Sequence, residues 1–520
     1  MTGNVVLKEH QKDHFNRLKQ IISFSKFYID ESPTGTGKTF VTLALAAELG
    51  MKIFLVANKT ALTVWKKVCK EVDFTIDIIL TYGELRGIKS SGTKNLKHGF
   101  LIREDIYEKD ATNKPIHRIK FHPTDKLIAL IGAKTLFVFD EGQALRNNTA
   151  QNSSATAICN AITLEHPSKF AILSATSHDS EIQSLNFARM IGIVSHTMLA
   201  IDGRFEKFGI GEMVTFCHKI DSQKTEKLMN SRDLFCHRGN YQHIIHRLYT
   251  EIVVQNVASS MPPLKTNFSV DAKNGYYKLD GEKLIELNKG IQNLAQAARA
   301  YDDGRGNFVI YGSKSQNFSA ITQALMNIEK SKIGIFVRVA KETLEHNPQC
   351  KVILYVSYLN TIAEIERELS DYKMVVLTGS VNGHVINSEG ERMDKREHLI
   401  QQFQEDDETR IFVSVIQVGK EAISLHDLEG TSPRYMFISP SYNLIDMIQA
   451  MGRVYREGIK SDVTVRFLYA KGANKEMNIL NAMARKSSIL KEVNKIQTEE
   501  ASKTGVFIKY PGEFDQYVED

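Results

Sequence analysis

The chain has 520 residues, which is too long for one hydrophobic core and predicts roughly two to four domains. Lysine and arginine exceed aspartate and glutamate by only 66 to 61, so composition alone does not predict a nucleic-acid binder. No apolar run approaches the length of a membrane span, and the first residues show no secretory signal. We therefore expect an intracellular globular protein with no membrane partner.

The cysteines offer little evidence for a metal or redox site. The five are scattered, and none forms a C-x-x-C pair, which argues against a zinc ribbon or a redox dithiol. Two Cys-His pairs, Cys217-His218 and Cys236-His237, provide four ligands in principle. Neighbouring ligands are geometrically awkward for tetrahedral zinc, so reduced, partly buried thiols are the favoured interpretation.

The first motif is SPTGTGKTF, residues Ser32 to Phe40. The preceding tetrad FYID, residues 27–30, is typical of a short strand. The following TFVTLALAAELG is rich in helix formers and ends at Gly50, a plausible helix stop. A strand, a glycine-containing loop and a helix in this order are the context that a nucleotide-binding P-loop requires.

Each residue type in the loop has a mechanical role toward a nucleotide such as ATP. Gly35 and Gly37 let the backbone curl so that its N–H groups point at phosphate oxygens, and the helix N-terminus adds attraction for the anion. Lys38 brings a charge to the β- and γ-phosphates, and Thr39 offers a hydroxyl to Mg²⁺. Ser32 stands where the P-loop pattern has its first glycine. The predicted ATP-binding residues of the loop are Thr34, Gly35, Thr36, Gly37, Lys38 and Thr39.

A second motif, TLFVFDEGQALRN, begins at Thr135. Its apolar run is typical of a strand, and Asp140-Glu141 follow at the end where parallel sheets bind ligands. We expect Asp140 to hold Mg²⁺ through water and Glu141 to polarise the attacking water. The alternative is an acidic pair that merely solvates a strand end. A third strand-like segment, FAILSATS, places Ser174-Ala175-Thr176 where they can hydrogen-bond the acidic pair.

These three segments, in this order, resemble the motor core of superfamily 2 helicases and translocases, whose fold is two RecA-like lobes. Leu7, His10 and Gln11 are similar to the upstream motif whose glutamine reads the adenine edge. The resemblance implies contacts with a nucleic-acid backbone for two further strand segments, KIFLVANKTALTVWKK (52–67) and IILTYGELR (78–86). For Trp65, which lies in the first of them, a core anchor is favoured over base stacking.

The second half carries matching motifs. The segment YNLIDMIQAMGRVYREG contains Q-x-x-G-R-x-x-R, with Gln449, Arg453 and Arg456 at the defined positions. The resemblance implies that the two arginines reach the ATP held by the first half and offset charge in the transition state. Upstream, a segment that resembles the family's motif V keeps Gly419, while Lys420 and Ala422 replace expected glycines.

Within the superfamily, DEGQALRN and TYGELR resemble the corresponding segments of SWI/SNF-type ATPases, and other stretches are similar to the helicases of large DNA viruses. This resemblance favours duplex DNA as the nucleic-acid partner of an ATP- and Mg²⁺-dependent motor. An RNA helicase acting in transcription termination or RNA processing is one alternative, and an inactive motor core serving as a binding scaffold is another. Protein partners are not predictable from the sequence.

The predicted fold class is α/β, with two RecA-like doubly wound parallel-sheet lobes and a helical insertion between them. We expect the ATP-binding lobe at residues 1–195, the insertion at 196–345 with a loop near 302–316, and the second lobe at 346–485. A C-terminal helix and tail should fill 486–520. For the polar segment 87–127, a mobile solvated loop is favoured over a loop that faces nucleic acid.

Overall fold

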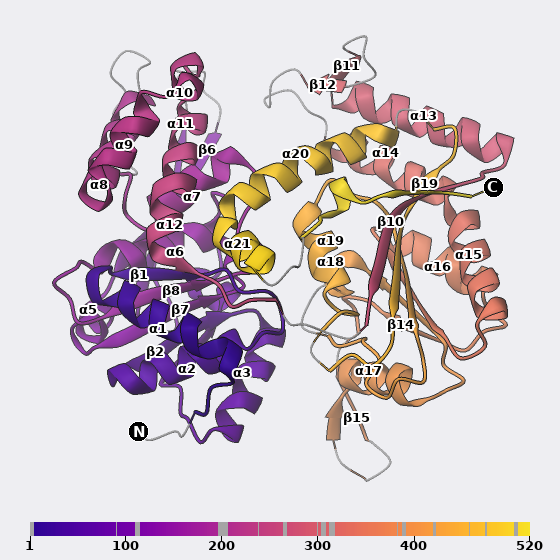
Figure 1. Cartoon of the computed structure of the whole chain (residues 1–520), viewed down its shortest axis with the longest axis horizontal. Coiled ribbons are helices and arrows are strands. Elements are labelled where there is room, and N and C mark those ends of the chain that lie inside the picture. The colour runs from indigo at the N-terminus through magenta and orange to yellow at the C-terminus, as the bar shows by residue number, and fades with distance from the viewer. Residues whose placement is uncertain are drawn as a thin grey trace. The chain divides into compact units, whose positions relative to one another are not determined.

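The computed structural model describes most of the chain (Figure 1). The described residues are 5–89, 91–109, 115–195, 206–237, 239–263, 268–298, 300–302, 308–310, 318–381, 383–386, 390, 392–419, 423–456, 458–473, 476–503 and 508–519. The chain divides into two compact units. Unit 1 contains residues 1–264 and 489–508, and unit 2 contains residues 265–488 and 509–520.

Unit 1 is built on a parallel sheet of six strands. In spatial order these are β3 (Ile78–Thr81), β2 (Lys52–Ala57), β7 (Thr135–Asp140), β8 (Lys169–Leu173), β1 (Phe27–Asp30) and β9 (Ala258–Ser259). The central strands are near-continuous apolar runs because both faces of the sheet are buried. One contact between neighbouring strands is the stacking of Phe27 on Phe170, with ring centroids 5.2 Å apart.

Helices connect the strands of this sheet, as expected for parallel strands. The helices up to β8 are α1 (Glu9–Phe24), α2 (Lys38–Leu49), α3 (Lys59–Glu71), α4 (Tyr82–Arg86), α5 (Asp125–Gly132) and α6 (Ala150–Ala161). The predicted strand at 27–30 and the helix that ends before Gly50 are confirmed. Gly50 has a φ of 61°, a left-handed conformation that glycine adopts at helix ends.

A helical segment follows β8 and leads back to the sheet at β9. It contains α7 (Glu181–Met190), α8 (Glu206–Ile220), α9 (Ser222–Met229), α10 (Arg232–Cys236), α11 (Tyr241–Leu248), a π-helix (Tyr249–Val254) and α12 (Gln255–Val257). Unit 1 also includes the end of α20 (Met477–Val493) and all of α21 (Lys495–Lys503). The five cysteines are free thiols, and Cys159, Cys217 and Cys350 are buried, as expected.

The expectation of a mobile loop at 87–127 was wrong. This segment forms an antiparallel sheet of β4 (Gly92–Asn95), β5 (Leu101–Lys109) and β6 (Pro115–Pro123). The first half of β5 alternates buried and half-buried residues, which is the pattern of a strand with one covered face. Arg103 and Asp105 are polar residues on the buried side, where Arg103 donates two hydrogen bonds to Asp105 at 2.6 and 2.9 Å. That pairing allows a charged sequence to form a covered strand.

Unit 2 is built on a second parallel sheet, of seven strands. In spatial order these are β14 (Met374–Leu377), β17 (Ile411–Val415), β13 (Lys351–Val356), β18 (Arg434–Ile438), β19 (Val463–Ala470), β10 (Val270–Tyr277) and β20 (Gln516–Val518). All six residues of β13 are buried. Figure 1 shows α15 (Ile333–His346) and α16 (Leu359–Glu368) on one side of this sheet and α18 (Ile416–Gly419) and α19 (Leu444–Met451) on the other. The α/β class with two parallel sheets is therefore confirmed.

The remaining elements of unit 2 surround this sheet or form small ladders. The helices are α13 (Gly281–Ala297), α14 (Phe318–Ser331), α17 (Lys395–Glu405) and the first part of α20, and the ladders pair β11 (Ala300–Asp302) with β12 (Phe308–Ile310) and β15 (His384–Ile386) with β16 (Arg392–Asp394). The segment expected as an insertion, 196–345, is divided between the units at residue 264. Much of the expected loop near 302–316 lies outside the described residues. Among the helices that the structure describes, none has the length and apolar character needed to cross a bilayer.

A buried ion pair connects the strands and helices of unit 2. Lys332, between α14 and α15, lies 2.5 Å from Glu476, and the two side chains are 1% and 2% exposed. Lys332 also donates to the Leu468 carbonyl at 3.0 Å, and Glu476 accepts from the Ala470 backbone N–H at 2.9 Å. These bonds attach the α14–α15 junction to the end of β19.

Replacing Lys332 with methionine should destabilise unit 2 by about 3–5 kcal/mol, because Glu476 would remain buried without its cation. The matched control is Lys330→Met, since Lys330 pairs with Glu364 at the surface and its side chain is 61% exposed. Loss of that pair should cost less than about 1 kcal/mol. Urea unfolding followed by circular dichroism measures both, and equal effects of the two substitutions would contradict the assignment.

Candidate nucleotide-binding site

The P-loop follows β1 directly and leads into α2. Gly35 has a φ of 86° and Gly37 a φ of 99°, conformations that side-chain-bearing residues rarely adopt. Gly37 is the residue before α2, so the loop ends at the positive end of a helix dipole. Thr39 lies in the first turn of that helix and is half-buried, and Thr34 is also half-buried. The loop therefore has the curled backbone and the helix N-terminus of an anion site.

The ammonium group of Lys38 lies against its own loop. Its Nζ donates to the Ser32 carbonyl at 2.9 Å and to the Pro33 carbonyl at 3.2 Å. Both acceptors are neutral, so a phosphate oxygen would be a stronger partner for the same charge. Lys38 is thus tethered at the loop, within reach of an anion bound there.

Ser32 shows why the loop does not need its first glycine. Its φ is not positive, so a Cβ causes no backbone strain at this position. Its hydroxyl accepts a hydrogen bond from the Met261 N–H at 2.8 Å, and the neighbouring Glu31 N–H donates to the Ser259 carbonyl at 2.9 Å. The serine therefore connects the start of the P-loop to the segment after β9.

Asp30 and His14 are two residues near the loop that the sequence did not single out. His14 Nε2 lies 3.2 Å from Asp30 Oδ2, and both side chains are buried. Asp30 Oδ1 accepts from the Ser32 N–H at 2.9 Å. Burial acts to raise the pKa of Asp30, but His14, Lys38 and the Ser32 bond lower it overall. An ionised Asp30 thus holds the loop backbone through its hydrogen bond with the Ser32 N–H. The sequence feature that could have identified Asp30 is an acidic residue at the end of the strand before a P-loop.

Gln11 packs directly on the P-loop. Its Nε2 donates to the Thr36 carbonyl at 3.1 Å, and its Oε1 accepts from the Lys8 N–H at 2.9 Å. A Cβ on Gly37 would lie 2.2 Å from Gln11 Nε2, so a larger residue at Gly37 would displace this side chain. Gln11 therefore lies at the site. To hydrogen-bond adenine as predicted, its side chain would have to give up its bonds to the Thr36 carbonyl and the Lys8 N–H.

Asp140 ends β7 with its carboxylate held on both oxygens. Trp65 Nε1 donates to Oδ2 at 2.7 Å, and the Glu141 N–H donates to Oδ1 at 2.8 Å. Tyr82 donates to the Asp140 carbonyl at 2.7 Å. Burial, and then the charge of Glu141, raise the pKa of Asp140 to about 6, while Trp65 and Lys38 act in the opposite direction. Trp65 is 1% exposed, as expected of a core anchor, but its bond to Asp140 was not foreseen.

Glu141 has a left-handed backbone, with φ 53° and ψ 50°, which is uncommon for a residue with a side chain. Such a conformation is costly and is often found at functional sites. Glu141 Oε2 accepts from Gln143 Nε2 at 2.5 Å, and Gln143 Oε1 accepts from the Ser174 hydroxyl at 2.7 Å. Ser174 is therefore connected to Glu141 through Gln143, whereas the sequence predicted that the Ser174 segment would hydrogen-bond the acidic pair itself.

The end of α20 contacts the same region. Asn494 Nδ2 donates to the Ala175 carbonyl at 2.5 Å, and the Ser177 hydroxyl lies 3.4 Å from Asn494 Oδ1. Asn494 is fully buried in unit 1. A residue more than 300 positions away in sequence thus holds the SATS segment, and through Ser174 and Gln143 it is connected to Glu141.

The arginine motif is described within unit 2. Arg453 Nε donates to the Gln449 carbonyl at 3.1 Å, and Arg456 Nε donates to the Gly452 carbonyl at 2.9 Å, so both guanidinium groups lie at the C-terminus of α19. The negative end of the helix dipole favours cations at this position. Arg456 also donates to the Ser424 hydroxyl at 3.0 Å. The structure therefore places Arg453 and Arg456 at the end of α19, where Gln449 contributes its backbone carbonyl.

Gly419 packs against this part of unit 2. Its carbonyl accepts from the Tyr355 hydroxyl at 3.0 Å, and a Cβ added to it would lie 2.0 Å from the Tyr355 ring. This close approach explains the glycine without any contact to nucleic acid. Lys420 and Ala422, the departures from the family pattern, lie outside the described residues.

The chain is similar to several known proteins, although no protein-family model matches it. A putative ATP-dependent RNA helicase of Acanthamoeba polyphaga mimivirus is 22% identical over 499 residues, which are 93% of this chain and 83% of the relative. The Sulfolobus solfataricus SWI2/SNF2 ATPase core in complex with dsDNA is 15% identical, with 96% of both chains covered and a TM-score of 0.29. The C-terminal part of the Fun30 ATPase domain is 16% identical, covering 44% of this chain and 99% of that one, with a TM-score of 0.27.

The predicted resemblance to superfamily 2 helicases, including those of large DNA viruses, is confirmed by the viral relative, which matches nearly the whole chain. The chain combines this similarity with two parallel-sheet units and with a P-loop and an acidic pair at one end of a sheet.

Replacing Trp65 with phenylalanine should raise the pKa of Asp140 further, because the carboxylate would lose a donor to its ionised form. Asp140 is predicted to hold Mg²⁺ in its ionised form, so the variant's loss of affinity for nucleotide with Mg²⁺ should grow as the pH falls through about 6. A hydrogen bond to a charged group contributes about 1.5–3 kcal/mol, which predicts that the variant's nucleotide affinity is roughly tenfold or more below that of the wild-type chain at the lowest pH.

Titration with a fluorescent ATP analogue and Mg²⁺ across this pH range measures the effect. The wild-type chain and the phenylalanine variant should converge at alkaline pH, where Asp140 is ionised in both. A loss of affinity that is equal at every pH would indicate a packing defect alone and would contradict the role of Trp65.

Proposed function

We propose that the protein is an ATP-dependent nucleic-acid motor that couples hydrolysis to movement along a nucleic-acid backbone. The observation that carries this proposal is the position of the P-loop and the acidic pair at the same edge of one sheet. Only β8 separates β1 from β7, so the strand ends that carry them are about 10 Å apart. That spacing suits a nucleotide phosphate chain with a metal ion between loop and carboxylate.

The residues at this edge fit ATP and Mg²⁺. Mg²⁺ prefers oxygen ligands, and the Thr39 hydroxyl and the Asp140 carboxylate supply them, the latter through water. When bound, the cation would neutralise charge on the phosphates. The raised pKa of Asp140 supports this fit, because a nearby cation would stabilise the ionised form. The loop residues Thr34 to Lys38 would bind the phosphates through their N–H groups, and Gln11 would face the base.

We assign the reaction to residues of this chain in the following way. Glu141 would orient the attacking water and accept its proton, with Gln143 holding the carboxylate in place. Arg453 and Arg456 would offset charge on the transferred phosphoryl group, with Gln449 supporting Arg453 through its carbonyl.

For the track we propose duplex DNA, because DEGQALRN and TYGELR resemble the segments of SWI/SNF-type ATPases. Single-stranded RNA is the second candidate, because the viral relative is described as a putative RNA helicase. Either track would be held through backbone phosphates, which makes binding independent of sequence and sensitive to salt.

The ATPase rate of the full chain should rise when nucleic acid is added. Duplex DNA, single-stranded DNA and RNA of equal length are compared at equal phosphate concentration, and duplex DNA should stimulate most. Preferential stimulation by single-stranded RNA would show that RNA, and not duplex DNA, is the track.

The variant Lys38→Ala should keep its fold and lose hydrolysis with every nucleic acid, so normal turnover by this variant would disprove the site. Absence of any turnover by the wild-type chain would favour the scaffold alternative.

Replacing Arg453 with glutamine should lower kcat by about a thousandfold or more, as expected for an arginine that acts on the transition state. Nucleotide affinity should change much less, because the effect falls on the reacting phosphoryl group. The control Arg485→Gln removes an exposed arginine from α20 of unit 2 and should leave kcat unchanged. Similar kcat values for both variants, with both folded, would remove Arg453 from the mechanism.

A further inference from the structure

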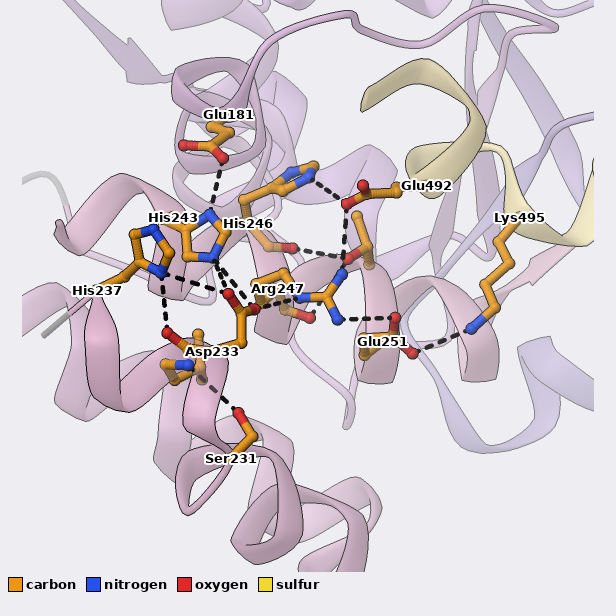
Figure 2. Close-up of polar contacts among 12 residues, drawn as sticks. Glu181, Ser231, Asp233, His237, His243, His246, Arg247, Glu251, Glu492 and Lys495 are labelled. Carbon is orange, nitrogen blue, oxygen red and sulfur yellow. Dashed lines mark hydrogen bonds and ion pairs between the residues drawn. The ribbon is translucent and has the colours of Figure 1, made fainter. Parts of the chain in front are cut away.

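A cluster of metal-ligating side chains lies in unit 1, apart from the nucleotide site (Figure 2). It consists of Asp233 on α10, His237 just after that helix and His243 on α11. One ligand-capable atom from each side chain lies within 4.8 Å of the other two. The nucleotide site does not use these residues.

Two of the three separations between the ligand atoms match those around a tetrahedral ion. His243 Nε2 lies 3.3 Å from both oxygens of Asp233, and His237 Nδ1 lies 3.3 Å from Asp233 Oδ1. Two ligand atoms bound to zinc at about 2.0–2.1 Å with tetrahedral angles are about 3.3 Å apart. The two imidazole rings are also close, with centroids 4.4 Å apart.

The hydrogen bond made by His243 Nδ1 determines which ring nitrogen carries the proton. His243 Nδ1 lies 2.8 Å from Glu181 Oε1 on α7, so this nitrogen carries a proton and donates it (Figure 2). In a neutral ring, Nε2 would then turn a lone pair toward the Asp233 carboxylate, and two acceptors would face each other. Either a second proton or a cation between them relieves this repulsion. A carboxylate that holds the outer nitrogen of a histidine is a recurrent feature of metal sites.

The charges around the cluster favour a cation of charge two. Arg247 lies 3.3 Å from Asp233 Oδ2 and also pairs with Glu251 and Glu492, and Lys495 pairs with Glu251. Together with Glu181, these groups contain four carboxylates, of Asp233, Glu181, Glu251 and Glu492, and two cations, Arg247 and Lys495. Their net charge is minus two when the histidines are neutral. Figure 2 shows these groups as one continuous polar network.

We propose that Asp233, His237 and His243 bind a divalent transition-metal ion, with Zn²⁺ as its representative. Asp233 Oδ1, His237 Nδ1 and His243 Nε2 are the protein ligands, and water completes the tetrahedron. His237 Nδ1 lies 2.9 Å from the Asp233 carbonyl, so ligation replaces that hydrogen bond and needs the tautomer that carries its proton on Nε2. The set differs from the Cys-His pairs considered from the sequence, since Cys217 is buried and bonds toward the Leu248 carbonyl.

The ion would act as a structural clip. It would join α10 to α11, and through Glu181 it would also attach α7. The chain continues from α11 through the π-helix and α12 to β9, which pairs with the strand before the P-loop. Binding here would therefore stabilise the path that leads to β9, without contact with the nucleotide.

The test uses the full chain, freed of metal with a chelator and titrated with Zn²⁺ by calorimetry at neutral pH without Mg²⁺ or nucleotide. One equivalent should bind. His237→Ala and His243→Ala should abolish this binding, and Glu181→Gln should weaken it by about 10–100-fold. The matched control is His218→Ala, which removes a histidine of unit 1 whose described contact is with Ser222. It should bind like the wild-type chain.

Co²⁺ supplies a second readout, since a tetrahedral site gives intense visible absorption that an octahedral surface ion does not. This spectrum should disappear in the two histidine variants and remain in the His218 control. His237 is partly exposed, with 47% of its side chain accessible, so its alanine variant should stay folded, and circular dichroism checks this. Absence of stoichiometric Zn²⁺ binding, or equal binding by all variants, would overturn the proposal and leave an imidazolium–carboxylate ion pair.

Discussion

The carboxylate of Asp140 is the constraint around which the proposed nucleotide site is organised. It stands at the end of a buried strand beside a second carboxylate, and burial together with Glu141 raises its pKa to about 6. A negative charge in such a place costs free energy unless donors or cations face it. Trp65 supplies one donor and the backbone of Glu141 another, while Lys38 contributes positive charge from the P-loop. These donors and Lys38 stabilise the ionised carboxylate of Asp140, whose burial is unfavourable for folding and whose charge suits the proposed cation.

Segments distant in sequence converge on the same edge of the sheet in unit 1. Met261 holds Ser32 at the start of the P-loop, and Asn494 holds Ala175 beside the acidic pair. Burial, and then the charges of Asp30 and Glu499, raise the pKa of Glu31 well above the usual range for a glutamate, although Gln497 donates its N–H to that carboxyl group. The junction of α20 and α21 and the start of α21 thus pack against the edge of the sheet that carries the P-loop and the acidic pair. Substitutions in residues 489–503 are therefore expected to affect nucleotide turnover without contacting nucleotide.

Local patterns account for what the sequence predicted well. The strand at 27–30, the glycines of the loop and the helix ending before Gly50 follow from propensity and backbone geometry, and the acidic pair follows from the strand that precedes it. The bond from Trp65 to Asp140 spans 75 positions and depends on tertiary packing, so no local pattern encodes it. The segment 87–127 was misjudged because its charges suggested solvent, whereas Arg103 and Asp105 pair with each other on the buried face of β5.

The central claim is that the P-loop and Asp140 bind one nucleotide and its metal ion together. A structure determined with Mg²⁺ and a non-hydrolysable ATP analogue tests it most directly. In such a structure, Lys38 is expected to leave the Ser32 and Pro33 carbonyls for the phosphates, and the metal ion is expected to contact Thr39 with Asp140 in its hydration shell. A nucleotide bound elsewhere, or a Lys38 ammonium that stays on its own loop while the phosphates lie beyond its reach, would disprove this binding mode.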